Sequence, residues 1–216
     1  MVAFPTNWAV LLIGGSSGVG KTTVARRIGR QLGRSVVHVD DLRLAFQHSR
    51  VHLPDAAGTA ALYFFWDAPD VWQRPPAELR DALIAVGAAL APAIEIVVAN
   101  HIDQAEMGPI VIEGDNIVPA LFARPMIHER ATGGRIRGLF LVEPDEGTLL
   151  ANSMARGRHG FGQTEAEQRT EARAKWLYGQ WVADEALRWR LPVVEPRPFE
   201  TLDERVMVAI ATAGHW

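Results

Sequence analysis

The sequence contains no cysteine. This absence excludes a disulfide framework and any metal site built from thiolates, and it fits a reducing compartment. A strong charge of either sign is also missing, because the formal net charge is -3 and the isoelectric point is about 6.2. Such a balance gives no general attraction to nucleic acid or to anionic membrane. We therefore expect neither of these as a partner.

Targeting and membrane-spanning segments are not evident either. The segment Met1–Trp8 has neither the basic region nor the apolar core of a signal peptide. The apolar run Trp8–Ile13 is too short to cross a bilayer, and we expect no other stretch to reach the required length of about 20 residues. These features predict a cytoplasmic protein.

Lysine is scarce, since it occurs only at Lys21 and Lys175 while arginine is abundant. A lysine inside a glycine-rich loop is therefore not a by-product of a lysine-rich surface. With 216 residues, 48% hydrophobic and 22% charged, the chain has an ordinary globular composition. This length predicts a single domain over residues 1–216.

Short apolar runs alternate with helical segments along the chain. The expected strands are Ala9–Ile13, Ser35–Val39, Pro109–Ile112, Leu139–Val142 and Pro192–Val194. The expected helices are Lys21–Leu32, Asp41–His48, Ala77–Asp103 with a kink near Pro92, Pro144–Ala155, Thr164–Trp189 and Thr201–Ala211. Val51–Pro76 looks irregular. This alternation predicts a three-layer α/β fold with a five-stranded, mainly parallel sheet, whose ligands bind at the carboxyl ends of the strands.

One motif in the first βα connection carries specific chemistry. The residues Gly15, Ser16, Ser17, Gly18, Val19, Gly20, Lys21 and Thr22 satisfy G-x-x-x-x-G-K-[ST], and Thr23 follows. Glycines let successive backbone amides point at phosphate oxygens, and the following helix presents its positive end to the same anion. Lys21 is expected to bridge the β- and γ-phosphates, and the Thr22 hydroxyl to bind Mg²⁺. The motif predicts a P-loop that binds a nucleoside triphosphate.

Other nucleotide-binding classes fit less well. A Ras-like GTPase needs an N-K-x-D motif, which the sequence lacks. The glycines of Gly14–Gly18 also have spacings like a dinucleotide fingerprint, but the Gly-Lys-Thr that follows favours a triphosphate.

Three segments together resemble small-molecule P-loop kinases. They are Gly14–Ala25, Val39–Arg43 and Val111–Pro119, the last an apolar strand that ends in Glu-Gly. The nearest resemblance is to the 2-phosphoglycerate kinase-like group, although Asp115-Asn116 departs from its Val-His. Chloramphenicol phosphotransferase and the zeta-toxin type kinases are similar in the first two segments. The resemblance implies a P-loop NTPase fold, ATP and Mg²⁺ as cofactors, and a small acceptor with a hydroxyl group.

Two aspartates follow the expected second strand. The resemblance points to Asp40 as the base that accepts the hydroxyl proton, or as a group that holds Mg²⁺ through water. Asp41 either contributes to the acceptor site or simply caps the next helix. Arg43 is expected either to grip an acidic acceptor or to be an ordinary exposed arginine.

Further acceptor-side residues follow the expected third strand. Glu113 ends a buried strand, where an unpaired carboxylate would be costly, so metal or substrate contact is favoured over a passive role. Asp115 and Arg124 are additional candidates for binding the acceptor. The region 51–103 is expected to form a helical acceptor side, with the aromatics Tyr63–Trp66 and Trp72 either lining the pocket or packing as core.

Two more segments are assigned by analogy with such kinases. Residues 156–163 are dense in arginine and glycine and are expected to form a lid that brings Arg156 and Arg158 onto the transferring phosphoryl group. An ordinary basic loop is the alternative. Phe199, in the proline-rich turn after the last strand, is expected to pack on the adenine or else to belong to the edge of the core.

The function predicted from these features is ATP-dependent transfer of a γ-phosphoryl group to a hydroxyl of a small molecule. Candidate acceptors are phosphorylated acids, nucleosides and antibiotics. The alternatives are a regulatory P-loop module that hydrolyses ATP slowly and a nucleic-acid end kinase. The second alternative is disfavoured because no basic stripe with interleaved aromatics is present.

Overall fold

The central feature of the fold is one five-stranded sheet in which every neighbouring pair is parallel. The structure, a computed structural model, describes residues 8–104, 108–123, 126–127, 130–155 and 163–212. The strand order is β2-β3-β1-β6-β7. These strands are β1 (Val10–Gly15), β2 (Val36–His38), β3 (Ile110–Glu113), β6 (Ile136–Leu141) and β7 (Val193–Val194). The predicted α/β class and five-stranded parallel sheet are confirmed.

The described part of the chain also contains seven α-helices. They are α1 (Lys21–Leu32), α2 (Val39–His48), α3 (Ala56–Asp67), α4 (Pro76–Asp103), α5 (Glu146–Ala155), α6 (Glu165–Arg188) and α7 (Leu202–Thr212). Short 3₁₀ turns cover η1 (Val71–Gln73), η3 (Pro119–Ala123) and η4 (Phe199–Thr201). A small hairpin pairs β4 (Met126–Ile127) with β5 (Arg130–Ala131).

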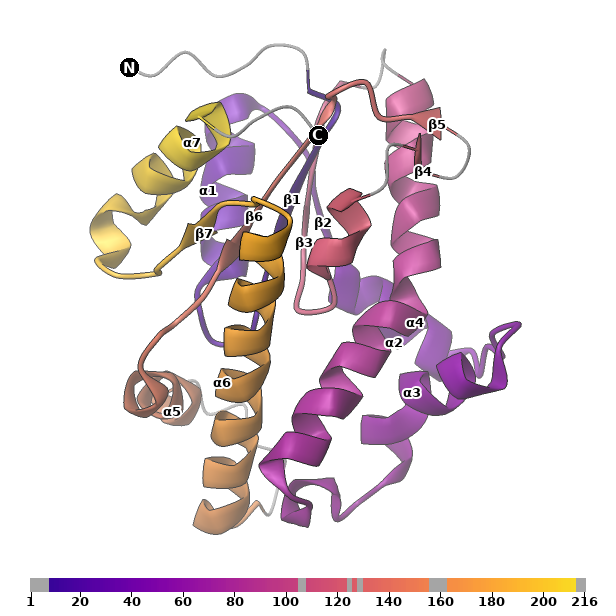
Figure 1. Ribbon diagram of the computed structural model, residues 1–216, viewed down its shortest axis with the longest axis vertical. Coiled ribbons are helices and arrows are strands. Elements are labelled where there is room, and N and C mark those ends of the chain that lie inside the picture. The colour runs from indigo at the N-terminus through magenta and orange to yellow at the C-terminus, as the bar shows by residue number, and fades with distance from the viewer. Residues whose placement is uncertain (1–7, 105–107, 124–125, 128–129, 156–162, 213–216) are drawn as a thin grey trace.

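Alternate residues of each buried strand supply two separate hydrophobic layers. In β1, Val10 and Leu12 belong to the core shared with α4 and α6, whereas Leu11 and Ile13 belong to the core shared with α1 and α7. All four side chains are fully buried. Figure 1 shows α1 and α7 on one side of the sheet and α4 on the other. Because β1 is apolar at every position, it can lie at the centre of a sheet that is covered on both faces.

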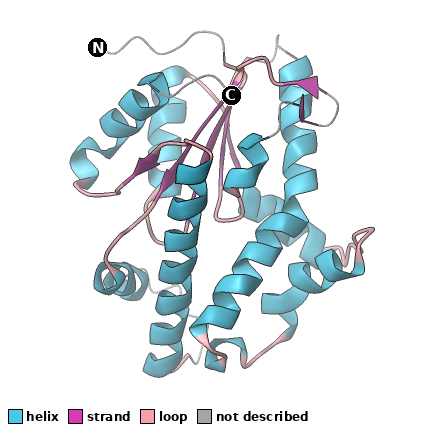
Figure 2. Ribbon diagram, viewed as in Figure 1, coloured by secondary structure: helices cyan, strands magenta, loops and turns pink. Residues whose placement is uncertain are grey.

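The strand order creates a switch point at the carboxyl end of β1. From β1 the chain moves to one side for β2 and β3 and to the other side for β6 and β7. Ligands of open parallel sheets bind in the crevice at such a point. Figure 2 shows helices and the loops that join them beyond this edge of the sheet. The glycine motif connects β1 to α1 here, so the fold places it where a ligand is expected.

Helix α4 is one continuous helix of 28 residues with Pro92 inside it. Figure 1 shows that it changes direction partway along, as expected for a proline within a helix. Its length and composition would suffice to cross a membrane, so our expectation that no stretch reaches that length was wrong. Half of its apolar window is buried inside the fold, where it packs against α3 and α6. A buried core helix passes the same test of hydropathy.

Two local predictions were also wrong. The stretch predicted to be irregular, Val51–Pro76, contains α3, whose N-terminus is capped by the carboxylate of Asp55 through the amides of Ala57 and Gly58. Helix α2 begins at Val39, two residues earlier than predicted, with His38 at the N-cap position. Asp41 therefore lies in the first turn and is not the cap.

Candidate phosphotransfer site

The glycine motif forms a tight loop that ends at an open helix terminus. Gly15 has φ 127°, and a Cβ there would lie 2.1 Å from the carbonyl oxygen of Leu141, so only glycine fits. Gly20 has φ 91° and is the N-cap of α1, where no described side chain accepts a hydrogen bond from the first-turn amides. No acidic residue occupies that first turn. The amides and the positive end of α1 are thus available to an anion.

Lys21 lies at the base of this loop and is almost completely buried. Its ammonium donates to the carbonyl oxygen of Ser16 at 2.7 Å and forms an ion pair with Asp115 at 2.5 Å. Asp115 follows the carboxyl end of β3, so the contact joins the phosphate loop to the neighbouring strand. A cation in this position can interact with the phosphate groups that the loop would bind.

Thr22, Glu113 and His38 form a chain of polar contacts beside Lys21. The hydroxyl of Thr22 donates to Oε1 of Glu113 at 2.8 Å, and Nδ1 of His38 lies 2.5 Å from the same oxygen. His38 and Glu113 are opposite each other in the pairing of β2 with β3. The buried carboxylate that we expected to need a partner therefore has two. His38 was not predicted as a site residue.

The donor set beside the phosphate loop is compatible with Mg²⁺. Thr22 offers a hydroxyl oxygen and Glu113 a carboxylate oxygen, and oxygen ligands of this kind suit a hard cation. Over the described ranges, no group of three or more histidine or acidic side chains is arranged to hold a metal. Mg²⁺ in nucleotide enzymes uses only one or two protein ligands together with phosphates and water, so a larger cluster is not required.

A cavity of about 240 Å³ extends from the phosphate loop into the helical region, and we call it the acceptor cavity. Ser17 of the glycine loop lines it together with the carboxylates of Asp40 and Asp115. The other lining residues come from α2, α3, η1, α4, α6 and the turn after β3, and they are Arg43, Gln47, Leu62, Phe65, Trp72, Leu83, Val86, Asn116, Glu171 and Lys175. A small molecule in this cavity would therefore lie next to the glycine loop.

Asp40 reaches the cavity because α2 starts directly at the end of β2. The tight approach of α2 to the turn after β3 requires Gly114, since a Cβ there would lie 2.6 Å from Cβ of Val39. Asp40 is half exposed and accepts from Arg43 at 3.1 Å. Asp41 is exposed and is not among the residues that line the cavity.

Arg43 is held by a second partner on its own helix. It donates to Oε1 of Gln47 at 3.2 Å, and Gln47 in turn donates to the carbonyl oxygen of Leu62 at 2.7 Å. This chain of contacts ties α2 to α3. It fixes the wall of the cavity that carries both Asp40 and Arg43.

Helix α6 contributes an ion pair to the cavity, and neither of its residues was predicted to belong to the site. Lys175 contacts Glu171 one turn away, and both side chains are largely buried. The ammonium also lies 5.9 Å from the ring centre of Trp72. Trp72 and Phe65 stack at 5.4 Å, so the predicted aromatic segment lines the cavity with two of its rings.

Tyr178 supports the turn that carries Asp115. Its hydroxyl donates to the backbone oxygen of Asp115 at 2.6 Å. Burial raises the pKa of Tyr178, and the negative charge of Asp115 raises it further. The tyrosine therefore stays neutral and keeps its proton for this hydrogen bond.

A second cavity, of about 220 Å³, adjoins the phosphate loop on the side of α1. Gly20, Thr23, Val24 and Arg27 line it together with Phe199 and Leu202. Phe199 thus lies close to the start of α1, as its predicted role beside a nucleotide base requires. The predicted residues Arg124, Arg156 and Arg158 lie outside the described residues.

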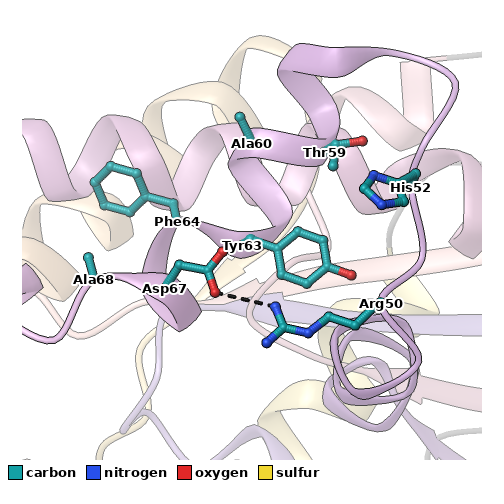
Figure 3. Close-up of a pocket in the computed structure, with 8 residues that line it drawn as sticks. All are labelled: Arg50, His52, Thr59, Ala60, Tyr63, Phe64, Asp67 and Ala68. Atoms are coloured by element: carbon teal, nitrogen blue, oxygen red, sulfur yellow. Dashed lines mark hydrogen bonds and ion pairs between the residues drawn. The ribbon is translucent and has the colours of Figure 1, made fainter.

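A cavity of about 410 Å³, larger than the acceptor cavity, lies elsewhere (Figure 3). Its lining includes Tyr63, Phe64 and the exposed ion pair of Arg50 with Asp67 at 3.4 Å. Residues 63 and 64 point to the face of α3 opposite to residues 62 and 65, which line the acceptor cavity. No residue of the glycine motif lines this larger cavity. Size alone therefore does not identify the chemical site.

Comparison with known proteins leaves the family open. No protein-family model matches the chain, and no curated protein does. Among solved structures, a gluconokinase from Sinorhizobium meliloti 1021 has a TM-score of 0.47 and 15% identity, covering 95% of this chain and 93% of its own. A shikimate kinase from Acinetobacter baumannii in complex with shikimate has a TM-score of 0.45 and 14% identity, and the match covers 95% of this chain and 92% of that chain. A sugar kinase from Janibacter sp. HTCC2649 has a TM-score of 0.48 and 20% identity, and the match covers 96% of this chain and 99% of that chain.

These values are too low to assign a family or a substrate. None of the three structures is a 2-phosphoglycerate kinase, a chloramphenicol phosphotransferase or a zeta toxin. The narrower resemblance therefore stays a prediction.

Proposed function

We propose that this chain is a kinase that transfers the γ-phosphoryl group of ATP to a hydroxyl group of a small molecule. The observation that carries the proposal is the acceptor cavity, which runs from Ser17 of the phosphate loop to the carboxylates of Asp40 and Asp115. A nucleotide switch needs the loop but has no need of a cavity with carboxylates beside the terminal phosphate. A transferase needs both.

The nucleotide end is held by the loop from Gly15 to Thr23. Its backbone amides and the open N-terminus of α1 would bind the phosphate oxygens, and Lys21 would contribute its ammonium to the β- and γ-phosphates. Phe199 would pack against the base in the cavity that also includes Thr23 and Arg27. Binding and orientation of the triphosphate are the main contribution that such a loop makes to transfer.

Thr22 and Glu113 would hold Mg²⁺, Thr22 directly and Glu113 directly or through water. When bound, the ion neutralises charge on the β- and γ-phosphates. Glu113 is positioned by the contact with His38, which keeps the carboxylate turned toward Thr22. Asp40 is an alternative Mg²⁺ ligand, which would hold the ion through a water molecule.

Asp40 would accept the proton of the acceptor hydroxyl. The hydroxyl oxygen forms a bond to the γ-phosphorus while the bond from that phosphorus to the β,γ-bridging oxygen breaks, and ADP leaves with the electron pair. Asp41, Arg43, Asp115 and Arg124 were predicted to bind the acceptor, and Arg43 and Asp115 have the support that they line the cavity. Arg156 and Arg158 remain proposed lid residues that would stabilise the charge on the transferring group.

The test has two steps that separate nucleotide binding from transfer. Calorimetry with MgATP should give binding for the wild type and at least a tenfold loss for Lys21→Ala. Arg26→Ala removes an exposed charge from the same helix and should bind normally. ADP release is then measured against a panel of hydroxyl compounds. Acceptor-dependent release supports the kinase, whereas slow release that no acceptor changes would favour a regulatory ATPase.

A further inference from the structure

We propose that the acceptor is a hydroxyl compound that carries no net negative charge and presents an apolar face beside its hydroxyl group. The inference rests on the proposed kinase function and names the class of acceptor. It selects among the candidates raised by the sequence, because a phosphorylated acid does not fit this class.

The first argument is the charge of the acceptor cavity. Among the described residues that line it, three are carboxylates and two are cations. Both cations already have a carboxylate partner, Arg43 with Asp40 at 3.1 Å and Lys175 with Glu171. An anionic acceptor would have to displace one of these partners and would then face an unpaired carboxylate. A neutral hydroxyl compound can instead donate hydrogen bonds to Asp40 or Asp115.

The second argument is the apolar part of the cavity lining, which we call the apolar wall. It consists of the stacked rings of Phe65 and Trp72 together with Leu62, Leu83 and Val86. A fully hydroxylated acceptor would leave this wall facing polar groups. An acceptor with a ring or an alkyl face removes apolar surface from water on both sides. Aromatic side chains of this kind give offset stacking with a ring as well.

The ion pair of Glu171 with Lys175 sets the preference for an acceptor without negative charge. Their side chains are only 14% and 20% exposed, and Gln163 donates to the second oxygen of Glu171 at 3.2 Å. Glu171 is therefore held on both sides and neutralises Lys175 beside Trp72. Loss of the charge on Glu171 would leave a net cation on the wall of the cavity, where it would attract an anionic group.

The test uses matched compounds that differ in one feature. Mandelamide and mandelate share a ring and a hydroxyl group but differ in charge, and glucitol and gluconate are a matched pair without a ring. Binding of each compound is measured by calorimetry with the protein already saturated by Mg²⁺ and a non-hydrolysable ATP analogue. We expect mandelamide to bind at least tenfold more tightly than mandelate and than glucitol. Tighter or equal binding of mandelate or gluconate, or no binding of any of the four, would overturn the inference.

The controls separate this inference from the kinase proposal. If the ATP analogue binds and, in a separate assay with ATP, ADP release depends only on anionic acceptors, the acceptor class is wrong while the kinase stands. If the ATP analogue itself does not bind, the kinase proposal fails.

Variants test the two walls independently. Glu171→Gln should lower the mandelamide-to-mandelate affinity ratio about tenfold, whereas Glu165→Gln, an exposed glutamate on the same helix, should leave it unchanged. Trp72→Ala does not remove either member of the ion pair and should weaken mandelamide about tenfold, with the affinity for the ATP analogue unchanged. An unchanged ratio in folded Glu171→Gln, or unchanged mandelamide affinity in Trp72→Ala, counts against the proposal.

Discussion

The ammonium of Lys21 lies 2.5 Å from a carboxylate oxygen of Asp115, across the boundary between the phosphate loop and the acceptor cavity. The lysine side chain is 5% exposed and the aspartate 30% exposed, so the pair is only partly screened by water. A triphosphate bound in the loop would compete with Asp115 for the same ammonium. Nucleotide binding and the charge of the acceptor cavity are therefore linked through one ion pair.

Asp115→Asn should strengthen nucleotide binding. Without the carboxylate, Lys21 has one less partner to exchange for phosphate oxygens, and we expect the Kd for MgATP to fall severalfold, equivalent to about 1 kcal/mol. Calorimetry measures the change. Asp81→Asn, which removes an exposed aspartate paired with Arg80, is the control and should leave the Kd unchanged. Equal affinity in wild type and Asp115→Asn would show that the pair does not compete with nucleotide.

Thr22→Ala should raise the Mg²⁺ requirement. The variant lacks the hydroxyl that donates to Glu113 and that we assign to the metal, so we expect half-maximal activity at about tenfold higher Mg²⁺ or more. A magnesium titration of ADP release measures this. Thr22→Ser keeps the hydroxyl and should titrate like the wild type. If both variants titrate alike, the hydroxyl is not a metal ligand.

Local sequence signals were sufficient to predict α1 and the sheet. The helix was expected over Lys21–Leu32 and has those bounds, and Gly33 ends it in the left-handed conformation. Helix α3 was missed because prolines and clustered aromatics are typical of irregular segments, although Asp55 is a good N-cap residue. The start of α2 was missed because its N-cap position holds His38, whose side chain makes no cap hydrogen bond, so no capping signal marks it.

The site residues that were not predicted from the sequence depend on contacts between segments that are distant in the chain. His38 reaches Glu113 because of the register of β2 against β3, which the sequence does not specify. Lys175 lines the acceptor cavity because α6 packs against α4, and its position there follows from tertiary packing alone. The phosphate loop could be predicted because its residues are adjacent in the chain, whereas the acceptor cavity is assembled from that loop, the turn after β3, η1 and four helices.

Gly15→Ala should destabilise the protein severely. The new Cβ would overlap the carbonyl oxygen of Leu141, and φ at this residue is unfavourable for alanine. We expect a loss of about 3 kcal/mol or more in the free energy of unfolding, measured by urea denaturation. Gly33→Ala is the matched control: it also has positive φ, but no described atom lies within 4 Å of the added Cβ, and about 1 kcal/mol is expected. Similar losses in both variants would contradict the steric argument.

Phe199→Ala should separate recognition of the base from recognition of the phosphates. If Phe199 packs on the base, its removal weakens ATP binding about tenfold, because the apolar contact is lost. Inorganic tripolyphosphate lacks a base, so its affinity should be the same in wild type and variant. Calorimetry with both ligands measures the difference. Equal weakening for the two ligands would mean that the substitution distorts the phosphate loop instead.

Tyr178→Phe should change how stability depends on pH under alkaline conditions. Burial, together with the charge of Asp115, raises the pKa of Tyr178 above its ordinary value of 10.0. Below pH 10 the tyrosine is neutral in both the folded and the unfolded chain, so its contribution to stability is constant. Above pH 10 the unfolded chain loses this proton while the folded chain keeps it, and the wild type loses stability by up to about 1.4 kcal/mol per pH unit from this one group.

The phenylalanine variant has no such proton, so its stability should fall less steeply over the same range. At neutral pH it should already be less stable than the wild type by about 1 kcal/mol, because the hydrogen bond to the backbone oxygen of Asp115 is lost. Urea denaturation of both proteins across this pH range gives the two slopes, and titration of the other groups cancels in their difference. Parallel curves above pH 10 would mean that Tyr178 ionises as readily in the folded protein as in the unfolded chain.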